Sequence, residues 1–131
     1  MATYPDDVRY TEQHEWVRAD EKFVTLGITE FAADQLGAVS FVELPYAGEL
    51  FKPGVLVGRL SGESGSKAVN MPFLGQINSV NQGLSDSPGV VSDDPYGKGW
   101  FVRIEPGDLA EVDALMDADA YEKFVAEQGG G

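Results

Sequence analysis

Most of this chain consists of short apolar segments that end at turn residues, and this pattern limits what it can fold into. Residues 14–28 predict a β-hairpin, because two apolar segments flank the polar turn Ala19-Asp20-Glu21. About seven such strands with little helix between them indicate a small β-sandwich or flattened barrel. Further strands are expected at residues 38–45, 73–81 and 99–106, and within residues 49–60 the turn Lys52-Pro53-Gly54 is expected to lead into an apolar strand.

Helical spacing is confined to two parts of the chain. Residues 29–37 predict a short internal helix with Thr29 as its N-cap and Gly37 at its C-terminal cap. Apolar residues recur at helical intervals between positions 109 and 125, with a break expected at Asp117. The expected fold is therefore mainly β, with two antiparallel sheets, a short internal helix and C-terminal helices. We expect one domain over residues 1–128 and a flexible glycine tail over residues 129–131.

Composition and charge exclude several classes of function. The chain has 131 residues and a formal net charge of −13, from 22 acidic and 9 basic residues. Such a surface repels nucleic acid and anionic membranes, and it suits docking into basic clefts of protein partners. There is no cysteine, and no apolar stretch approaches the length of a membrane span. The N-terminal residues do not read as a signal or transit peptide, so we expect a soluble, cytoplasmic monomer.

Motifs for catalysis and metal binding are incomplete. Residues 62–66, Gly-Glu-Ser-Gly-Ser, miss the G-x-S-x-G nucleophile motif because Ser66 takes the last position. The single histidine, His14, is expected to be a structural residue in a strand rather than a general base. The pairs Asp6-Asp7 and Asp93-Asp94 lack the spacing and the companion ligands of a metal site. We therefore expect a chain that is not an enzyme and binds no metal.

Five segments of the sequence resemble one family in order and at its spacing. They are "RYTEQHEWVR", "VTLGITEFAADQLGAVSFVELPYAGE", "VNQGL", "DDPYGKGWFVRIEP" and "DALMDADAYEKFV". Together they are similar to the H protein of the glycine cleavage system. The resemblance implies a lipoyl-domain-type fold, also called a barrel-sandwich hybrid. It also implies a non-catalytic carrier, whose lipoyl group on a hairpin lysine moves an aminomethyl group between the P-, T- and L-proteins.

The sequence departs from the family at that lysine. The family motif reads approximately E-S-V-K, and a proline follows the lysine eight residues later. Counting back from Pro72 reaches Ser64, and the centre of the hairpin between Gly54 and Gly75 also falls beside Ser64. The resemblance therefore gives Ser64 the position of the lipoyl lysine, and Ser64 is expected within one residue of the hairpin tip.

Lys67 leaves two interpretations open. In the first, Glu63, Ser64 and Lys67 form a shifted motif, and Lys67 is the candidate attachment site for lipoate. In the second, Lys67 is an ordinary exposed lysine on the return strand and no lysine stands at the tip. A shift of three residues would move the inward side chains of each strand outward, so the register favours the second interpretation.

The C-terminal glycines suggest another carrier chemistry. The terminal pair Gly130-Gly131 resembles the end of ubiquitin-like sulfur carriers, where an adenylating enzyme and a sulfur-transfer enzyme convert the carboxylate to a thiocarboxylate. Only glycines pass a narrow adenylating channel. Three hypotheses follow: a lipoyl carrier that uses Lys67, a lipoate-free sulfur carrier that uses Gly131, and a pseudo-carrier that only binds protein partners.

Overall fold

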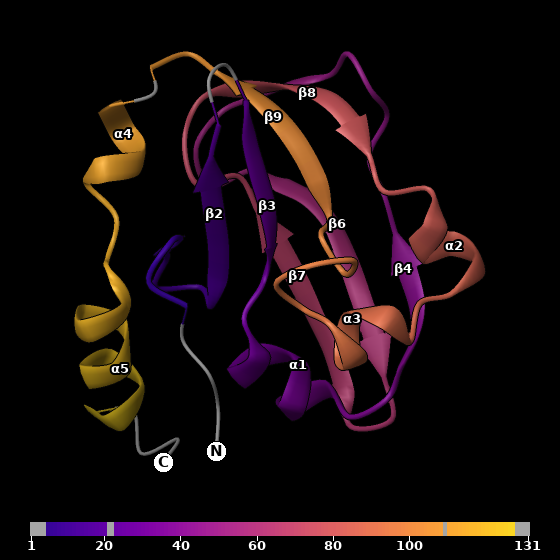
Figure 1. The fold of residues 1–131 in the computed structure, drawn as a ribbon. Coiled ribbons are helices and arrows are strands. Elements are labelled where there is room, and N and C mark those ends of the chain that lie inside the picture. Colours follow the sequence, from indigo (N-terminus) through magenta and orange to yellow (C-terminus); the bar gives the residue numbers. More distant parts are fainter. Residues whose placement is uncertain (1–4, 21–22, 109, 128–131) are drawn as a thin grey trace.

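The computed structural model describes residues 5–20, 23–108 and 110–127 (Figure 1). Their strands and helices alternate with short turns in chain order. The strands are β1 (Arg9–Tyr10), β2 (Glu15–Ala19), β3 (Val24–Ile28), β4 (Val39–Glu43), β5 (Leu50–Phe51), β6 (Leu56–Gly62), β7 (Gly65–Asn70), β8 (Gly75–Val80) and β9 (Val102–Pro106). The helices are α1 (Glu30–Leu36), α2 (Gly83–Asp86), α3 (Val90–Asp93), α4 (Ala110–Asp113) and α5 (Ala118–Glu127).

The strands form two antiparallel sheets, which confirms the predicted fold class. One sheet has the order β1-β2-β3-β9-β8-β5, and the other has the order β4-β6-β7. The predicted hairpin of residues 14–28 is present as β2 and β3, with Trp16 opposite Gly27. The two C-terminal helices lie beside β2, on the side away from β4 (Figure 1).

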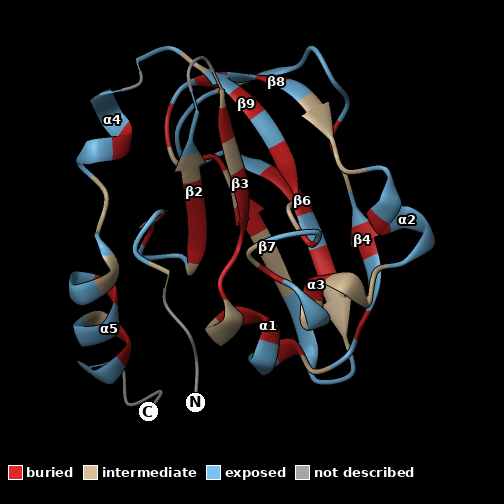
Figure 2. Ribbon diagram, in the orientation of Figure 1, coloured by how far each residue is buried: buried red, intermediate tan, exposed pale blue. Residues whose placement is uncertain are grey.

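Two apolar cores hold these layers together (Figure 2). The larger core fills the space between the sheets and includes Leu26, Leu60 and Ile104, each almost fully buried. The smaller core joins the first strands to α5, where the rings of Tyr10 and Tyr121 stack with centroids 4.5 Å apart. Trp16 belongs to the smaller core, and its indole Nε1 donates a hydrogen bond of 2.8 Å to the Pro95 carbonyl.

The predicted boundaries of the internal helix are confirmed, and those of the C-terminal helical region are confirmed in part. Thr29 caps α1, because its hydroxyl accepts a hydrogen bond from the Ala32 amide, and Gly37 ends the helix at φ 71°. The C-terminal helical region is interrupted over residues 114–117, which includes the predicted break at Asp117. The helical prediction for Leu115 and Met116 is wrong, because Met116 forms a β-bridge with Tyr10 instead. The two-residue strand β1 and the single-turn helices α2 and α3 were not predicted, because elements this short carry little periodic signal.

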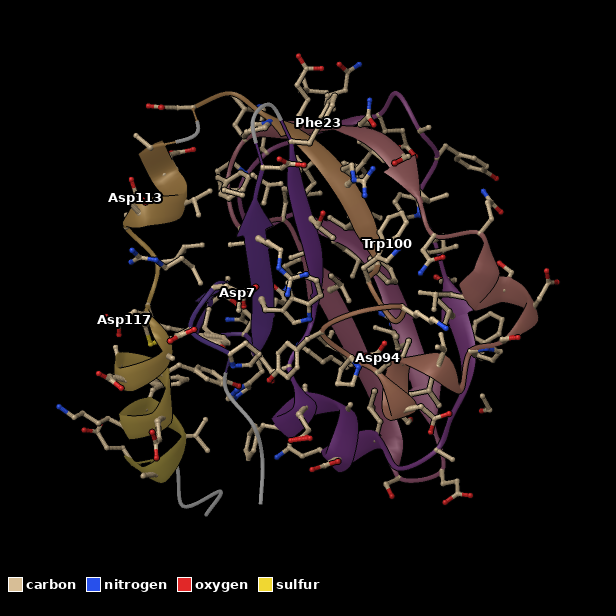
Figure 3. The ribbon with its side chains drawn as sticks, viewed as in Figure 1. Asp7, Phe23, Asp94, Trp100, Asp113 and Asp117 are labelled. Atoms are coloured by element: carbon tan, nitrogen blue, oxygen red, sulfur yellow. The ribbon has the colours of Figure 1, made fainter. Side chains whose placement is uncertain are left out.

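Many carboxylates remain on the surface of the fold. Asp94, Asp113 and Asp117 are exposed; Asp94 follows α3, Asp113 ends α4 and Asp117 precedes α5 (Figure 3). Asp7 makes an ion pair of 3.3 Å with Arg18. Within the described ranges, no group of three or more possible metal ligands comes together, and no helix has the length and apolarity needed to cross a membrane.

Candidate functional site

The tip of the hairpin β6–β7 lies at Glu63 and Ser64. The last residue pair of the two strands is Gly62 with Gly65, so only these two residues form the turn. Both side chains are exposed. The prediction that Ser64 lies within one residue of the tip is confirmed.

The end of α1 holds this tip in place. The Ser64 amide donates a hydrogen bond of 2.8 Å to the Leu36 carbonyl, and the Glu63 amide donates one of 3.2 Å to the Ala38 carbonyl. A Cβ atom added to Gly62 would lie only 2.5 Å from the Leu36 oxygen, so this close approach requires glycine. The tip is therefore fastened to the body of the domain, and only its side chains face the solvent.

Lys67 lies on the return strand and points inward. It is opposite Leu60 in the β6–β7 register, and directly opposed residues of an antiparallel pair project from the same face. Because Leu60 is buried in the main core, Lys67 is half-buried. Its Nζ donates hydrogen bonds to the Gln13 carbonyl and, over 3.3 Å, to the Ala68 carbonyl. The prediction of an ordinary exposed lysine is therefore wrong, although its assignment to the return strand is confirmed.

His14 lies close to the tip and packs against aromatic rings of the smaller core. It precedes β2 in a turn, with φ 64°, so its prediction as a strand residue is wrong. Its Nδ1 is 2.8 Å from the Tyr121 hydroxyl, which lies 2.8 Å from Oγ1 of Thr29. The imidazole also packs against Phe31 with ring centroids 4.7 Å apart. His14 thus joins α5 and the start of α1 to the region of the hairpin.

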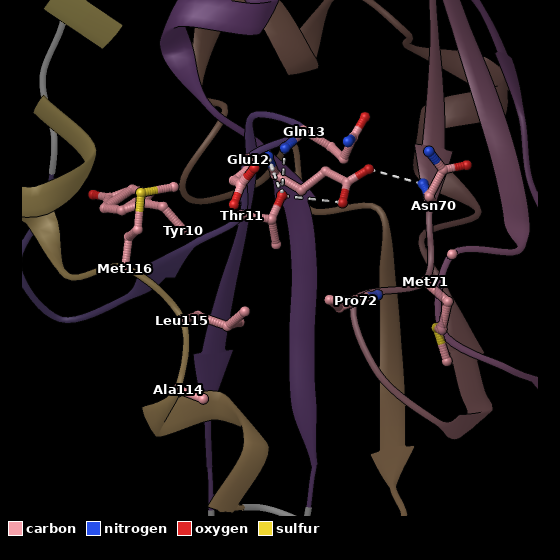
Figure 4. A pocket seen from close by; sticks show the side chains of 12 residues that line it. Tyr10, Thr11, Glu12, Gln13, Asn70, Met71, Pro72, Ala114, Leu115 and Met116 are labelled. Carbon is pink, nitrogen blue, oxygen red and sulfur yellow. Dashed lines mark hydrogen bonds between the residues drawn. The ribbon is translucent and has the colours of Figure 1, made fainter. Parts of the chain in front are cut away.

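Two hollows lie near the contact between Lys67 and Gln13, and Lys67 lines one of them while Gln13 lines the other. The smaller one, which we call the tip hollow, has a volume of about 210 Å³. The larger one, which we call the cleft, has a volume of about 450 Å³ and opens between the residues after β1, the end of β7 and the segment after α4 (Figure 4). Residues that line the tip hollow include His14, Gln35, Leu36, Ser64, Ser66 and Lys67.

Glu15 is a buried carboxylate in the wall of the cleft. It is 1% exposed, and its Oε2 accepts a hydrogen bond of 2.8 Å from the Asn70 amide on the edge of β7. Its Oε1 accepts one of 3.3 Å from the Thr11 hydroxyl. Burial raises the pKa of Glu15 to about 7, although the Asn70 amide, the Lys67 ammonium and the Thr11 hydroxyl all favour the charged form.

A Glu15→Gln variant is expected to be more stable than the native chain above about pH 7. The folded pKa of Glu15 lies above its ordinary value of 4.5, so the folded state binds more protons than the unfolded state between these values. The stability of the native chain therefore falls as the pH rises through this window, by up to about 3 kcal/mol from this group. Glutamine has the same shape and carries no charge.

Urea unfolding at several pH values measures this effect. The advantage of Glu15→Gln should shrink as the pH falls from about 7 and should be gone by about 4.5. Glu12→Gln, a neighbouring change in the lining of the same cleft, serves as the control. A stability difference for Glu15→Gln that does not vary with pH would contradict the assignment.

The sequence predictions named only part of this site. Glu63, Ser64 and Lys67 lie close together in the hairpin, because they are neighbours in the sequence. Glu15 was not predicted as a site residue. The strand pattern could have placed it in β2 opposite Ile28, where a carboxylate would be buried. Gly130 and Gly131, the predicted alternative carrier terminus, lie outside the described residues.

The fold and the hairpin define a lipoyl-domain-like protein. The structure superimposes on the crystal structure of a glycine cleavage system H protein from Mycobacterium marinum with a TM-score of 0.82 and 31% sequence identity. The match covers 95% of this chain and 98% of that one. The family model of the glycine cleavage H-protein matches residues 8–128, and the chain belongs to that family.

Individual relatives agree with the family match over nearly the whole chain. A glycine cleavage system H protein from Anaeromyxobacter sp. (strain K) is 44% identical over 124 residues, which are 95% of this chain and 97% of that protein. A glycine cleavage system H protein from Halorhodospira halophila is 41% identical over 130 residues, which are 98% of this chain and 100% of that protein. These similarities confirm the family that the sequence segments predicted, which is a family of carrier proteins.

Proposed function

We propose that this chain is an H-type docking protein whose hairpin carries no lipoyl arm. The observation that supports the proposal is the side chain at the tip, where Ser64 is exposed in the two-residue turn. The resemblance to the family gives Ser64 the position of the lipoyl lysine. A serine hydroxyl cannot form the stable amide that links lipoate to a lysine amine. The scaffold and its tip remain available for protein partners.

The position of Lys67 argues against a shifted attachment site. Its Nζ is engaged with the carbonyls of Gln13 and Ala68, and its side chain projects from the same face of the sheet as Leu60. A lipoate-attaching enzyme would have to draw this side chain out of its half-buried place. Burial lowers the pKa of Lys67, and the nearby charge of Glu15 opposes that shift only in part.

The proposed partners are enzymes that dock an H-type domain. The P-, T- and L-proteins of glycine cleavage are the first candidates, since they recognise this scaffold in the family. The net charge of −13 favours partners with basic docking clefts, and it raises their rates of association at low salt. The chain acts in this proposal through binding, without catalytic residues of its own.

The native chain is expected to stay unmodified when it is incubated with lipoate ligase, lipoate and ATP. Intact-protein mass spectrometry measures the result directly, and an H protein with a lysine at its tip serves as the positive control. The Lys67→Arg variant should likewise show only its own unmodified mass. A lipoyl increment on the native chain that is lost in Lys67→Arg would overturn the proposal and favour the lipoyl carrier.

The glycine tail suggests a second function, that of a sulfur carrier, and intact-protein mass spectrometry would also detect its product. The motivating observation is the terminal sequence Gly129-Gly130-Gly131. In the test, an adenylating enzyme and ATP would convert the terminal carboxylate to an acyl adenylate with release of pyrophosphate. Sulfide would then displace AMP, which takes one carboxylate oxygen with it, and the resulting thiocarboxylate has a characteristic mass. Such a product would show that the lipoate-free scaffold can carry sulfur, and its loss when residues 129–131 are deleted would assign the site to the glycine tail.

A further inference from the structure

The tip hollow has an unusual chemical lining for so acidic a chain. Among the described residues that line it there is one ammonium group, from Lys67, and no carboxylate. Ser64 and Ser66 add two hydroxyl groups, and Gln35 adds a side-chain amide, all of which can donate hydrogen bonds. Positive charge with several neutral donors is the chemistry that binds small oxyanions.

Lys67 has the capacity to hold such an ion. An ammonium group has three N–H donors, and two of them are used by the carbonyls of Gln13 and Ala68. The half-buried position of the group strengthens its attraction to an anion, because less water screens the charge. Binding would also oppose the lowering of its pKa by burial.

We propose that the tip hollow is a binding site for a small oxyanion such as phosphate, held by the ammonium group of Lys67 and the hydroxyl group of Ser64. The proposal rests on the lipoate-free function proposed above, since it requires the free amine of Lys67. The hollow, at about 210 Å³, is large enough for the ion, whether it is free or belongs to a larger ligand. Such a site would let the docking state of the hairpin respond to an anionic metabolite or to a phosphate on a partner.

Three features oppose the anion and set the expected strength, and one of them is the Glu15 carboxylate, whose charge already interacts with the Lys67 ammonium. The net charge of −13 repels the anion. A Glu63 carboxylate oxygen also lies near the Ser64 hydroxyl: a Cβ atom added to Gly37 would be 3.6 Å from the first and 3.2 Å from the second. The last carbonyl of α1, at Leu36, is satisfied by the Ser64 amide and does not face the ion unpaired. We expect a dissociation constant on the order of 1 mM.

Titration of the unmodified protein with inorganic phosphate tests the site, followed by ¹H–¹⁵N NMR at constant ionic strength. The amide signals of Ser64, Ser66 and Lys67 should move along a saturable curve. Lys67→Met should weaken binding about tenfold or more, whereas Lys52→Met, a change at an exposed lysine in the turn before β6, should leave it unchanged. Glu63→Gln should tighten binding, and the spectra also report whether each variant is folded.

The same titration contains the results that would overturn the proposal. Equal shifts with sodium chloride, a response that does not saturate, or equal affinity in Lys67→Met would each exclude a phosphate site at Lys67. Parallel titration with acetate distinguishes a carboxylate ligand, which should bind more weakly because it carries less charge and fewer acceptor oxygens. Intact mass confirms the free amine in every sample, so failure here leaves the lipoate-free function standing, and lipoylation of Lys67 would refute that function independently.

Discussion

A Ser64→Lys variant is expected to become fully lipoylated under conditions in which the native chain stays unmodified. The change returns an amine to the tip of the hairpin, where the side chain is exposed. Among the described residues, His14 is the only one other than glycine with a positive φ, so the backbone at Ser64 accepts lysine without strain. The hydrogen bonds that hold the tip come from backbone amides and survive the substitution.

Ser66→Lys is the matched control for this gain of function. Ser66 is also exposed, but it lies on β7 opposite Ser61, two residues beyond the tip. The attaching enzyme should modify the lysine at position 64 and leave the lysine at position 66 almost unmodified, as measured by intact mass and peptide mapping. Equal modification of both variants would show that the enzyme responds to exposure alone, and no modification of Ser64→Lys would refute the placement of the attachment position.

Gly27→Ala is expected to destabilise the domain by about 3 kcal/mol, because overpacking of a rigid core forces neighbouring groups to move. A Cβ atom on Gly27 would lie 2.6 Å from Cε2 of Trp16, the residue directly opposite it in the β2–β3 pair. The indole cannot move easily, since it is fully buried and its Nε1 is bonded to the Pro95 carbonyl. Thermal or urea unfolding measures the loss.

Gly89→Ala provides the comparison at a glycine with free space. Gly89 has helical dihedral angles, φ −62° and ψ −16°, and a Cβ atom there would meet nothing within 4 Å. The free energy of unfolding of Gly89→Ala should therefore differ from that of the native chain by less than about 0.5 kcal/mol. If Gly27→Ala and Gly89→Ala had the same stability, the tight contact between Gly27 and Trp16 would be refuted.

The sequence predicted the features that depend on local chemistry or on simple counting. The cap at Thr29 and the end of α1 at Gly37 follow from residues next to the helix. The position of Ser64 at the tip follows from the lengths of the two strands on either side of it. Both kinds of inference need only neighbouring residues or one hairpin, so no distant contact had to be known.

The parts of the site that could not be predicted depend on contacts between distant segments. Lys67 turns inward because its partner across the hairpin, Leu60, faces the core, and its hydrogen bond reaches Gln13, 54 residues away in the sequence. Glu15 is buried because the edge of β7 lies against the start of β2. The left-handed backbone of His14 follows from the turn that leads into β2, which the sequence alone does not distinguish from an extended strand.

The attachment of the tip to α1 has a consequence for any group that is grafted onto position 64. Because the amides of Glu63 and Ser64 are bonded to the carbonyls of Ala38 and Leu36, the tip is a fixed pivot rather than a swinging loop. The reach of a grafted arm is then set by the length of the arm alone, and its effective concentration at a docked partner is higher than from a mobile loop. To aim such an arm elsewhere, an engineer would have to alter the end of α1, a segment almost thirty residues earlier in the chain.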